Sequence, residues 1–213
     1  MNDRALGLLI FLPVPLVLFL FTRAPLGALA SLCAGVALMV THRLYARPFA
    51  LGRAGRRCLW CGSAVANGPS VTIREPLGTT TWRTCGAAHA HMLTRVLGWA
   101  QAHALFLRVG ILGTLAIFLL VAPLAAYGRL GPLTQANTVA LFRLGIALTV
   151  LPMGLLASRA APPSAEAIEA PFPVHIQALL GTAAVLWLFR LIGLAWLALG
   201  VWPQPNGSSR PRV

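Results

Sequence analysis

The chain has 213 residues, of which 58% are hydrophobic and 10% charged, and its mean hydropathy is +0.78. A soluble globular domain rarely has this balance, so the composition favours helices that span a bilayer. The net charge of +13 would suit a nucleic-acid partner, but all 17 basic residues are arginines that gather at the ends of apolar stretches, as in membrane proteins. We therefore expect a membrane protein and no nucleic-acid partner. The lysine-free, alanine- and glycine-rich composition indicates a GC-rich bacterial genome.

Five apolar stretches approach or exceed the roughly 20 residues that a transmembrane helix needs. They cover residues 5–22, 25–41, 109–127, 138–157 and 176–202. The predicted fold is an all-α polytopic membrane protein of about five transmembrane helices with a small α+β zinc-binding insertion. Its domains are a helical hairpin over 5–41, a cytoplasmic module over 42–108, three helices over 109–202 and a disordered tail over 203–213.

A cleaved signal peptide is the alternative interpretation of the first 35 residues, because a polar start is followed by an apolar run. Arg23, however, is followed almost directly by a second apolar run. This arrangement favours two helices that are retained in the mature protein.

The segment 42–108 contains the chemistry of the chain. Cys58 and Cys61 are separated by two residues, and Cys85 precedes His89 by four positions. Cytosolic cysteines stay reduced, and three thiols cannot all pair, so metal ligation is favoured over disulfides. Zn²⁺ accepts Cys thiolates and His nitrogens in a tetrahedral shell. The sequence therefore predicts a zinc site formed by these four residues. We expect it to be structural, because no carboxylate lies beside it.

The residues between the two ligand pairs support this prediction. The runs 71–74 and 79–82 are β-branched or aromatic and flank Glu75-Pro76-Leu77-Gly78, a pattern typical of a hairpin. A helical stretch from Cys85 would put His89 one turn further on the same face. The turn that carries Cys58 and Cys61, the hairpin and the helix together resemble the treble-clef zinc fingers. The C-x3-H ending, Cys85 to His89, is similar to the TRASH-type group. This resemblance covers 57–99 and implies metal binding, in a structural or a metal-sensing role.

A second histidine departs from the family pattern. His91 lies two residues beyond His89 and therefore on another helix face. It is the alternative ligand if the helix starts at a different residue.

Ionisable residues are scarce within the predicted spans. The four acids, Asp3, Glu75, Glu166 and Glu169, all lie outside them. Proton-coupled transport and intramembrane hydrolysis usually require such groups within the bilayer, so neither is favoured. Arg143 lies near a helix start and can extend to the headgroups. Arg190 lies near the middle of its run, so we expect it to face a carbonyl, water or the phosphate of an anionic lipid.

These features favour a binding or assembly module with a structural zinc site over an enzyme. The expected partners are the bilayer, an anionic lipid and a protein that binds the cytoplasmic module. One alternative is a metal-responsive protein that senses or delivers a soft metal. The other is a lipid-handling enzyme or transporter that uses Arg190. No internal repeat supports a transporter.

The distribution of arginines predicts the orientation. With five spans, eleven of the 17 arginines lie on the side of segment 42–108, four on the other side and two within spans. Positive residues concentrate on the cytoplasmic side, so the N-terminus and zinc module should be cytoplasmic and the C-terminus outside, in a bacterial inner membrane. A topology reporter fused within 62–69 should be active only as a cytoplasmic probe. Activity of a periplasmic reporter there would reverse the orientation and reopen disulfide formation among the cysteines.

Overall fold

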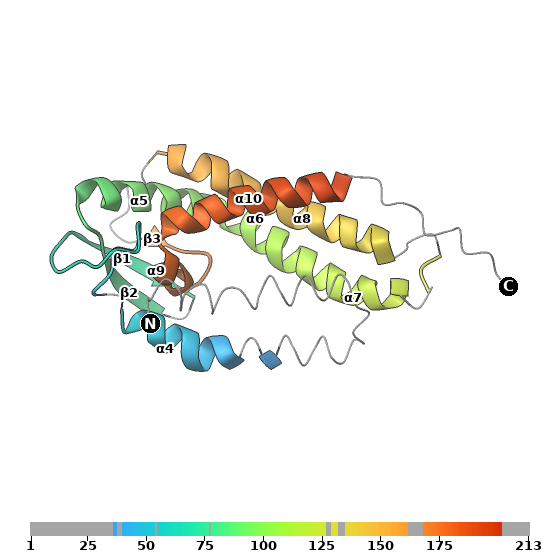
Figure 1. Ribbon diagram of the computed structural model, residues 1–213, viewed down its shortest axis with the longest axis horizontal. Coiled ribbons are helices and arrows are strands. Elements are labelled where there is room, and N and C mark those ends of the chain that lie inside the picture. Colours follow the sequence, from blue (N-terminus) through green and yellow to red (C-terminus); the bar gives the residue numbers. More distant parts are fainter. Residues whose placement is uncertain are drawn as a thin grey trace.

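The computed structural model describes residues 36–37, 40–53, 55–76, 78–126, 129–131, 135–161 and 168–201. This part of the chain is mostly helical with one small sheet (Figure 1). The sheet lies at one end of the molecule, and the long helices extend from it toward the other end. Among these described residues, three helical stretches are long and apolar enough to cross a membrane, namely Ala104–Ala122, Ala136–Arg159 and Thr182–Gly200. The first two of the five predicted spans lie almost wholly outside the described residues.

The third predicted span begins earlier than expected and continues directly from a helix of the module. The elements in this stretch are α5 (Ala87–Ala102), α6 (Ala104–Arg108), the π-helical turn η2 (Val109–Gly113) and α7 (Thr114–Ala126). Only His103 separates α5 from α6, and backbone hydrogen bonds of 3.0 Å link it to Trp99 on one side and Leu107 on the other. The α-helical path is interrupted at His103 and by the π-helical turn. Module and span are joined without a loop.

The fifth predicted span, 176–202, is broken in the structure. A 3₁₀ turn η4 (Val174–Ile176) and a short helix α9 (Gln177–Leu180) precede α10 (Thr182–Val201). Gly181 lies between them with φ of +88°, a left-handed conformation that glycine adopts without a Cβ clash. The apolar run concealed this break, because hydropathy does not distinguish one helix from two.

The predicted hairpin is present. Strands β1 (Ser70–Glu75) and β2 (Gly78–Arg83) pair antiparallel, with Val71 opposite Trp82 and Glu75 opposite Gly78. Before them, the chain forms the π-helical turn η1 (His42–Ala46) and the helix α4 (Arg47–Leu51).

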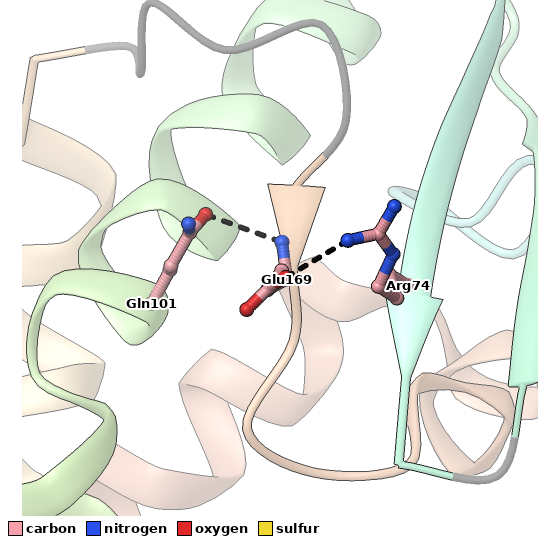
Figure 2. A network of polar contacts seen from close by, with 3 residues as sticks. All are labelled: Arg74, Gln101 and Glu169. Carbon is pink, nitrogen blue, oxygen red and sulfur yellow. Dashed lines mark hydrogen bonds and ion pairs between the residues drawn. The ribbon is translucent and has the colours of Figure 1, made fainter.

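A third strand, which the sequence did not predict, comes from the connector between α8 (Gln135–Leu156) and α10. This connector opens with the 3₁₀ turn η3 (Ala157–Arg159) and includes β3 (Ile168–Glu169), which pairs parallel with β1, so the strand order is β2-β1-β3. Figure 2 shows Glu169 between β1 and α5: Arg74 Nη1 donates to its carboxylate at 3.1 Å, and its own N–H donates to Gln101 Oε1 at 3.2 Å. Exposed ion pairs contribute about 1 kcal/mol or less, so backbone pairing sets the position of the strand. The module therefore includes residues beyond 42–108.

Two hydrophobic cores hold the module together. The first combines the sheet, α5 and the connector; its buried residues are Leu59, Val71, Ile73, Trp82, Leu93, Leu97, Ile168, Ala170, Val174 and Ala178. The second joins α5 and α6 to the module-facing ends of α8 and α10; its buried residues are Val96, Trp99, Ala100, Leu107, Met153, Ala157 and Leu186. The module-facing ends of the candidate spans are thus packed against α5 and α6.

A buried carboxylate fixes the connector at the end of β1. Glu75 accepts a hydrogen bond from the N–H of Val174 at 3.1 Å, and its Oε2 lies 3.5 Å from His175 Nδ1. Both side chains are almost fully buried. Buried polar groups need such partners, so this contact places η4 against the sheet.

Small residues let the first candidate span, Ala104–Ala122, lie close to the second, Ala136–Arg159. A methyl group on Gly110 would lie 2.4 Å from Thr149 Oγ1, and one on Gly145 would lie 2.7 Å from Thr114. Gly110 and Thr114 are one turn apart, as are Gly145 and Thr149. Paired small residues of this kind let membrane helices approach closely, which stabilises them by van der Waals packing.

Candidate metal centre

The four predicted ligands converge on one point. The ligand atoms of Cys58, Cys61, Cys85 and His89 all lie within 4.8 Å of one another, and the three cysteines are free of disulfides. Cys58 Sγ is 3.6 Å from His89 Nδ1, and Cys61 Sγ is 3.4 Å from Cys85 Sγ. Ideal tetrahedral zinc bonds would separate a sulfur and a nitrogen ligand by about 3.6 Å and two sulfurs by about 3.8 Å. The group therefore fits a single tetrahedral metal ion.

A tight turn positions the first ligand pair. The N–H of Gly62 donates to the carbonyl of Cys58 at 2.8 Å, and the N–H of Cys58 donates to the carbonyl of Ser63 at 2.9 Å. Gly62 has φ of +74°, which explains why glycine follows the second cysteine. We call residues 58–62 the knuckle.

The second ligand pair stands at the junction of the hairpin and α5. The N–H of Leu59 donates to the carbonyl of Arg83 at 3.0 Å, which fixes the knuckle beside the end of β2. Cys85 follows two residues later, and its N–H lies 3.3 Å from Cys58 Sγ. His89 lies in the first turn of α5, so the helix aims its ring at the knuckle.

The environment of the thiols favours a bound cation. Burial opposes ionisation of Cys61, but hydrogen bonds with Ser63, Cys85 and Cys58 outweigh it and lower the pKa of this thiol to about 6. Desolvation, hydrogen bonds with Cys61 and Cys58, and their negative charge raise the pKa of Cys85 to about 12. The thiols thus retain a proton among themselves. A divalent cation would displace it, so metal binding should weaken as the pH falls.

The site is open on one side. Cys58 is fully buried, Cys61 and His89 are half-buried, and Cys85 is exposed. His91, the alternative ligand, is also exposed and lies outside the group of four.

The knuckle also contacts the last membrane helix, which the sequence did not predict. The N–H and hydroxyl of Thr182 donate to the carbonyl of Leu59 at 2.8 and 3.0 Å, and the N–H of Ala183 donates to the carbonyl of Trp60 at 3.0 Å. The first N–H groups of a helix have no partner within it, and partial negative charge is favourable there. The two residues between Cys58 and Cys61 therefore cap α10. The signal in the sequence was Gly181-Thr182, a typical helix start that lies inside an apolar run.

Two glycines allow this contact. A methyl group on Gly181 would lie 2.7 Å from the carbonyl carbon of Cys61 and 2.8 Å from the nitrogen of Gly62. A methyl group on Gly62 would lie 3.0 Å from the carbonyl oxygen of Leu180. Because the obstructing atoms are backbone, they cannot move aside without distorting the knuckle.

Arg190 has a protein partner. Its Nε donates to the carbonyl of Gly154 at 2.6 Å, and its guanidinium lies 4.6 Å from the centre of the Trp187 ring. Gly154 is in the last turn of α8, where carbonyls lack helical partners and a cation is favourable. Of the three partners expected for Arg190, the carbonyl is thus present. A lipid contact at this residue stays a prediction.

Comparisons of the chain with models of known protein families, with curated proteins and with solved structures gave no match.

Removing any one of the four ligands should release the metal. We expect about one zinc ion per purified chain, because three thiolates and one imidazole complete a tetrahedral shell. The variants Cys58→Ser, Cys61→Ser, Cys85→Ser and His89→Ala should each lose the metal in elemental analysis. His91→Ala is the control and should retain it. Loss of metal from His91→Ala with retention in His89→Ala would make His91 the ligand.

The contact between knuckle and α10 predicts a difference between two glycine substitutions. Gly131 also has a positive φ, +58°, but no atom lies within 4 Å of a Cβ placed there. Gly131→Ala should therefore cost only the left-handed penalty of about 1–2 kcal/mol. Gly181→Ala adds the backbone clash, so it should lower the melting temperature further and speed zinc loss to a chelator. Equal effects of the two substitutions would mean that the knuckle does not depend on this contact.

Proposed function

We propose that this chain is an integral protein of the bacterial inner membrane in which a structural zinc site organises a cytoplasmic binding or assembly module on the ends of membrane helices. The observation that carries the proposal is the capping of α10 by the carbonyls of Leu59 and Trp60, the two residues between the knuckle cysteines. A metal ion that fixes the knuckle would therefore also fix the start of a membrane helix.

The other candidate spans support the same role. His89 lies on α5, which continues through His103 into α6 and the span Ala104–Ala122. Met153 and Ala157, at the module end of the second span, are buried against α5 in the second core. All three candidate spans thus contact elements of the module.

Zinc is the metal that suits this ligand set, and four protein ligands leave no open position for catalysis. Among the described residues, the group itself contains no carboxylate. Small domains with limited cores often depend on metal for stability. The binding free energy of the metal should then be part of the folding free energy of the module.

Metal removal should therefore loosen the module and the start of α10 together. In hydrogen–deuterium exchange on the purified full chain, a chelator should speed exchange at the amides of Thr182 and Ala183 as well as in the knuckle. The middle of α8 is the internal control and should keep its protection. Limited proteolysis should cut within 57–99 only in the metal-free protein. A metal-free wild type that still resists cleavage and protects these amides would refute a structural role for zinc.

A metal-responsive protein is the second candidate, and the exposure of Cys85 favours it. An exposed thiolate offers an incoming soft metal a point of attack, which a fully enclosed structural site would not. Rapid replacement of zinc by copper without unfolding would favour a sensor over a scaffold. The lipid-handling alternative is weaker, because the Nε of Arg190 already donates to Gly154.

A further inference from the structure

A hollow of about 320 Å³ lies beside the knuckle, on the side of α4. Three arginines and two small residues line it, namely Arg53, Arg56, Arg57, Gly52 and Ala64. The volume is at the lower end of the roughly 300–1,000 Å³ that is usual for small-molecule sites. We call it the arginine hollow.

Two of the three arginines are held in place by the surrounding structure. The guanidinium of Arg53 stacks 3.5 Å from the centre of the Phe49 ring on α4. Arg57 Nη1 donates to the carbonyl of Gly62 at 2.9 Å, and the backbone of Arg57 pairs with Ala64. The lining residues thus lie between the end of α4 and the knuckle, and just after the knuckle. Fixed side chains lose little entropy when they bind a ligand.

The third arginine and the local charge point to an anion. Arg56 is exposed, and within the described part of the chain no contact holds its guanidinium. Neither of the two acids among the described residues contacts Arg56, since Glu75 is buried against Val174 and Glu169 contacts Arg74. Three positive charges on one hollow attract a multivalent anion, and a guanidinium matches the oxygens of a phosphate in pairs.

The arginines that line the hollow follow soon after the second predicted span in the sequence. The helical turns η1 and α4 follow directly after the apolar stretch 25–41, and they expose Leu44 and Tyr45 at 60% and 71%. Apolar and aromatic side chains of this kind are typical of the interface, where lipid phosphates also lie. We propose that Arg53, Arg56 and Arg57 form a binding site for a phosphate group, carried by an anionic lipid or by a soluble phosphate compound.

The test uses the purified, zinc-loaded full chain in nanodiscs and compares two sources of phosphate. For a soluble source, inorganic phosphate is added to nanodiscs of phosphatidylcholine, against chloride at equal ionic strength. For a lipid source, phosphatidylglycerol replaces part of the phosphatidylcholine. Binding in either arm is followed as the rise in melting temperature with ligand, since a ligand of the folded state stabilises it. Native mass spectrometry then counts the phosphatidylglycerol molecules that remain bound.

A matched pair of variants distinguishes specific binding in the arginine hollow from general electrostatic attraction of the anion to the positively charged protein. Arg56→Gln should weaken the apparent affinity about tenfold or more, because it removes charge-assisted hydrogen bonds. Arg159→Gln removes one exposed charge outside the hollow and should change the affinity by less than about twofold, since exposed charges are screened. Both variants should retain their zinc, which confirms that the module is folded.

The outcomes show whether the bound phosphate is soluble or carried by a lipid, and whether the proposed site exists. A response to inorganic phosphate indicates a soluble ligand, whereas a response to phosphatidylglycerol alone indicates a lipid. If the wild type responds to neither phosphate source, or if Arg56→Gln and Arg159→Gln weaken binding equally, the proposal is overturned. Should Arg56→Gln lose its zinc, Arg56→Lys decides instead: lysine keeps the charge but not the paired contact, so it must weaken binding more than Arg159→Lys does.

Discussion

The hydrogen bonds between the knuckle and the start of α10 are the contact on which the rest of the arrangement depends. Three donors from Thr182 and Ala183 reach two carbonyls that lie between the metal-ligand candidates Cys58 and Cys61. Each buried polar group left without a partner would cost about 1–3 kcal/mol. Separating the knuckle from α10 is therefore expensive. The positions of Cys58 and Cys61 are therefore linked directly to the position of the start of α10 by these hydrogen bonds.

Some arginines in this chain have structural roles at the end of a helix. Arg190 donates to the carbonyl of Gly154 in the last turn of α8, and Arg95 on α5 donates to the carbonyls of Arg159 and Ala160 just beyond it. Carbonyls at the end of a helix lack partners and carry partial negative charge, so guanidinium groups suit them. Part of the high positive charge thus fixes the end of α8 to α5 and α10. The arginine hollow is a separate feature, because its three arginines line one space beside the knuckle.

The sequence alone determined the metal-ligand candidates, the hairpin and three apolar helices. These features are local: the two-residue spacing of Cys58 and Cys61 fits one tight turn, and Cys85 and His89 lie close together on either side of the start of α5. The expected helix from Cys85 is wrong in its start, because Gly86 is extended and α5 begins at Ala87, so Cys85 lies before the helix. Only a hairpin between the pairs is needed to bring them together, and its β-branched residues are visible in the sequence. The treble-clef resemblance and the identity of the metal stay predictions.

Only the tertiary structure decided how the module meets the membrane helices. Strand β3, the pairing of Glu75 with Val174 and the capping of α10 join residues about a hundred positions apart. Such contacts leave no periodic pattern, because each depends on a few backbone groups that become neighbours after the helices pack. Arg190 illustrates the limit: hydropathy put it in the middle of a span without an acidic partner, but its partner is a backbone carbonyl. Every residue carries a carbonyl, so the sequence could not identify the one at Gly154 that lies within reach.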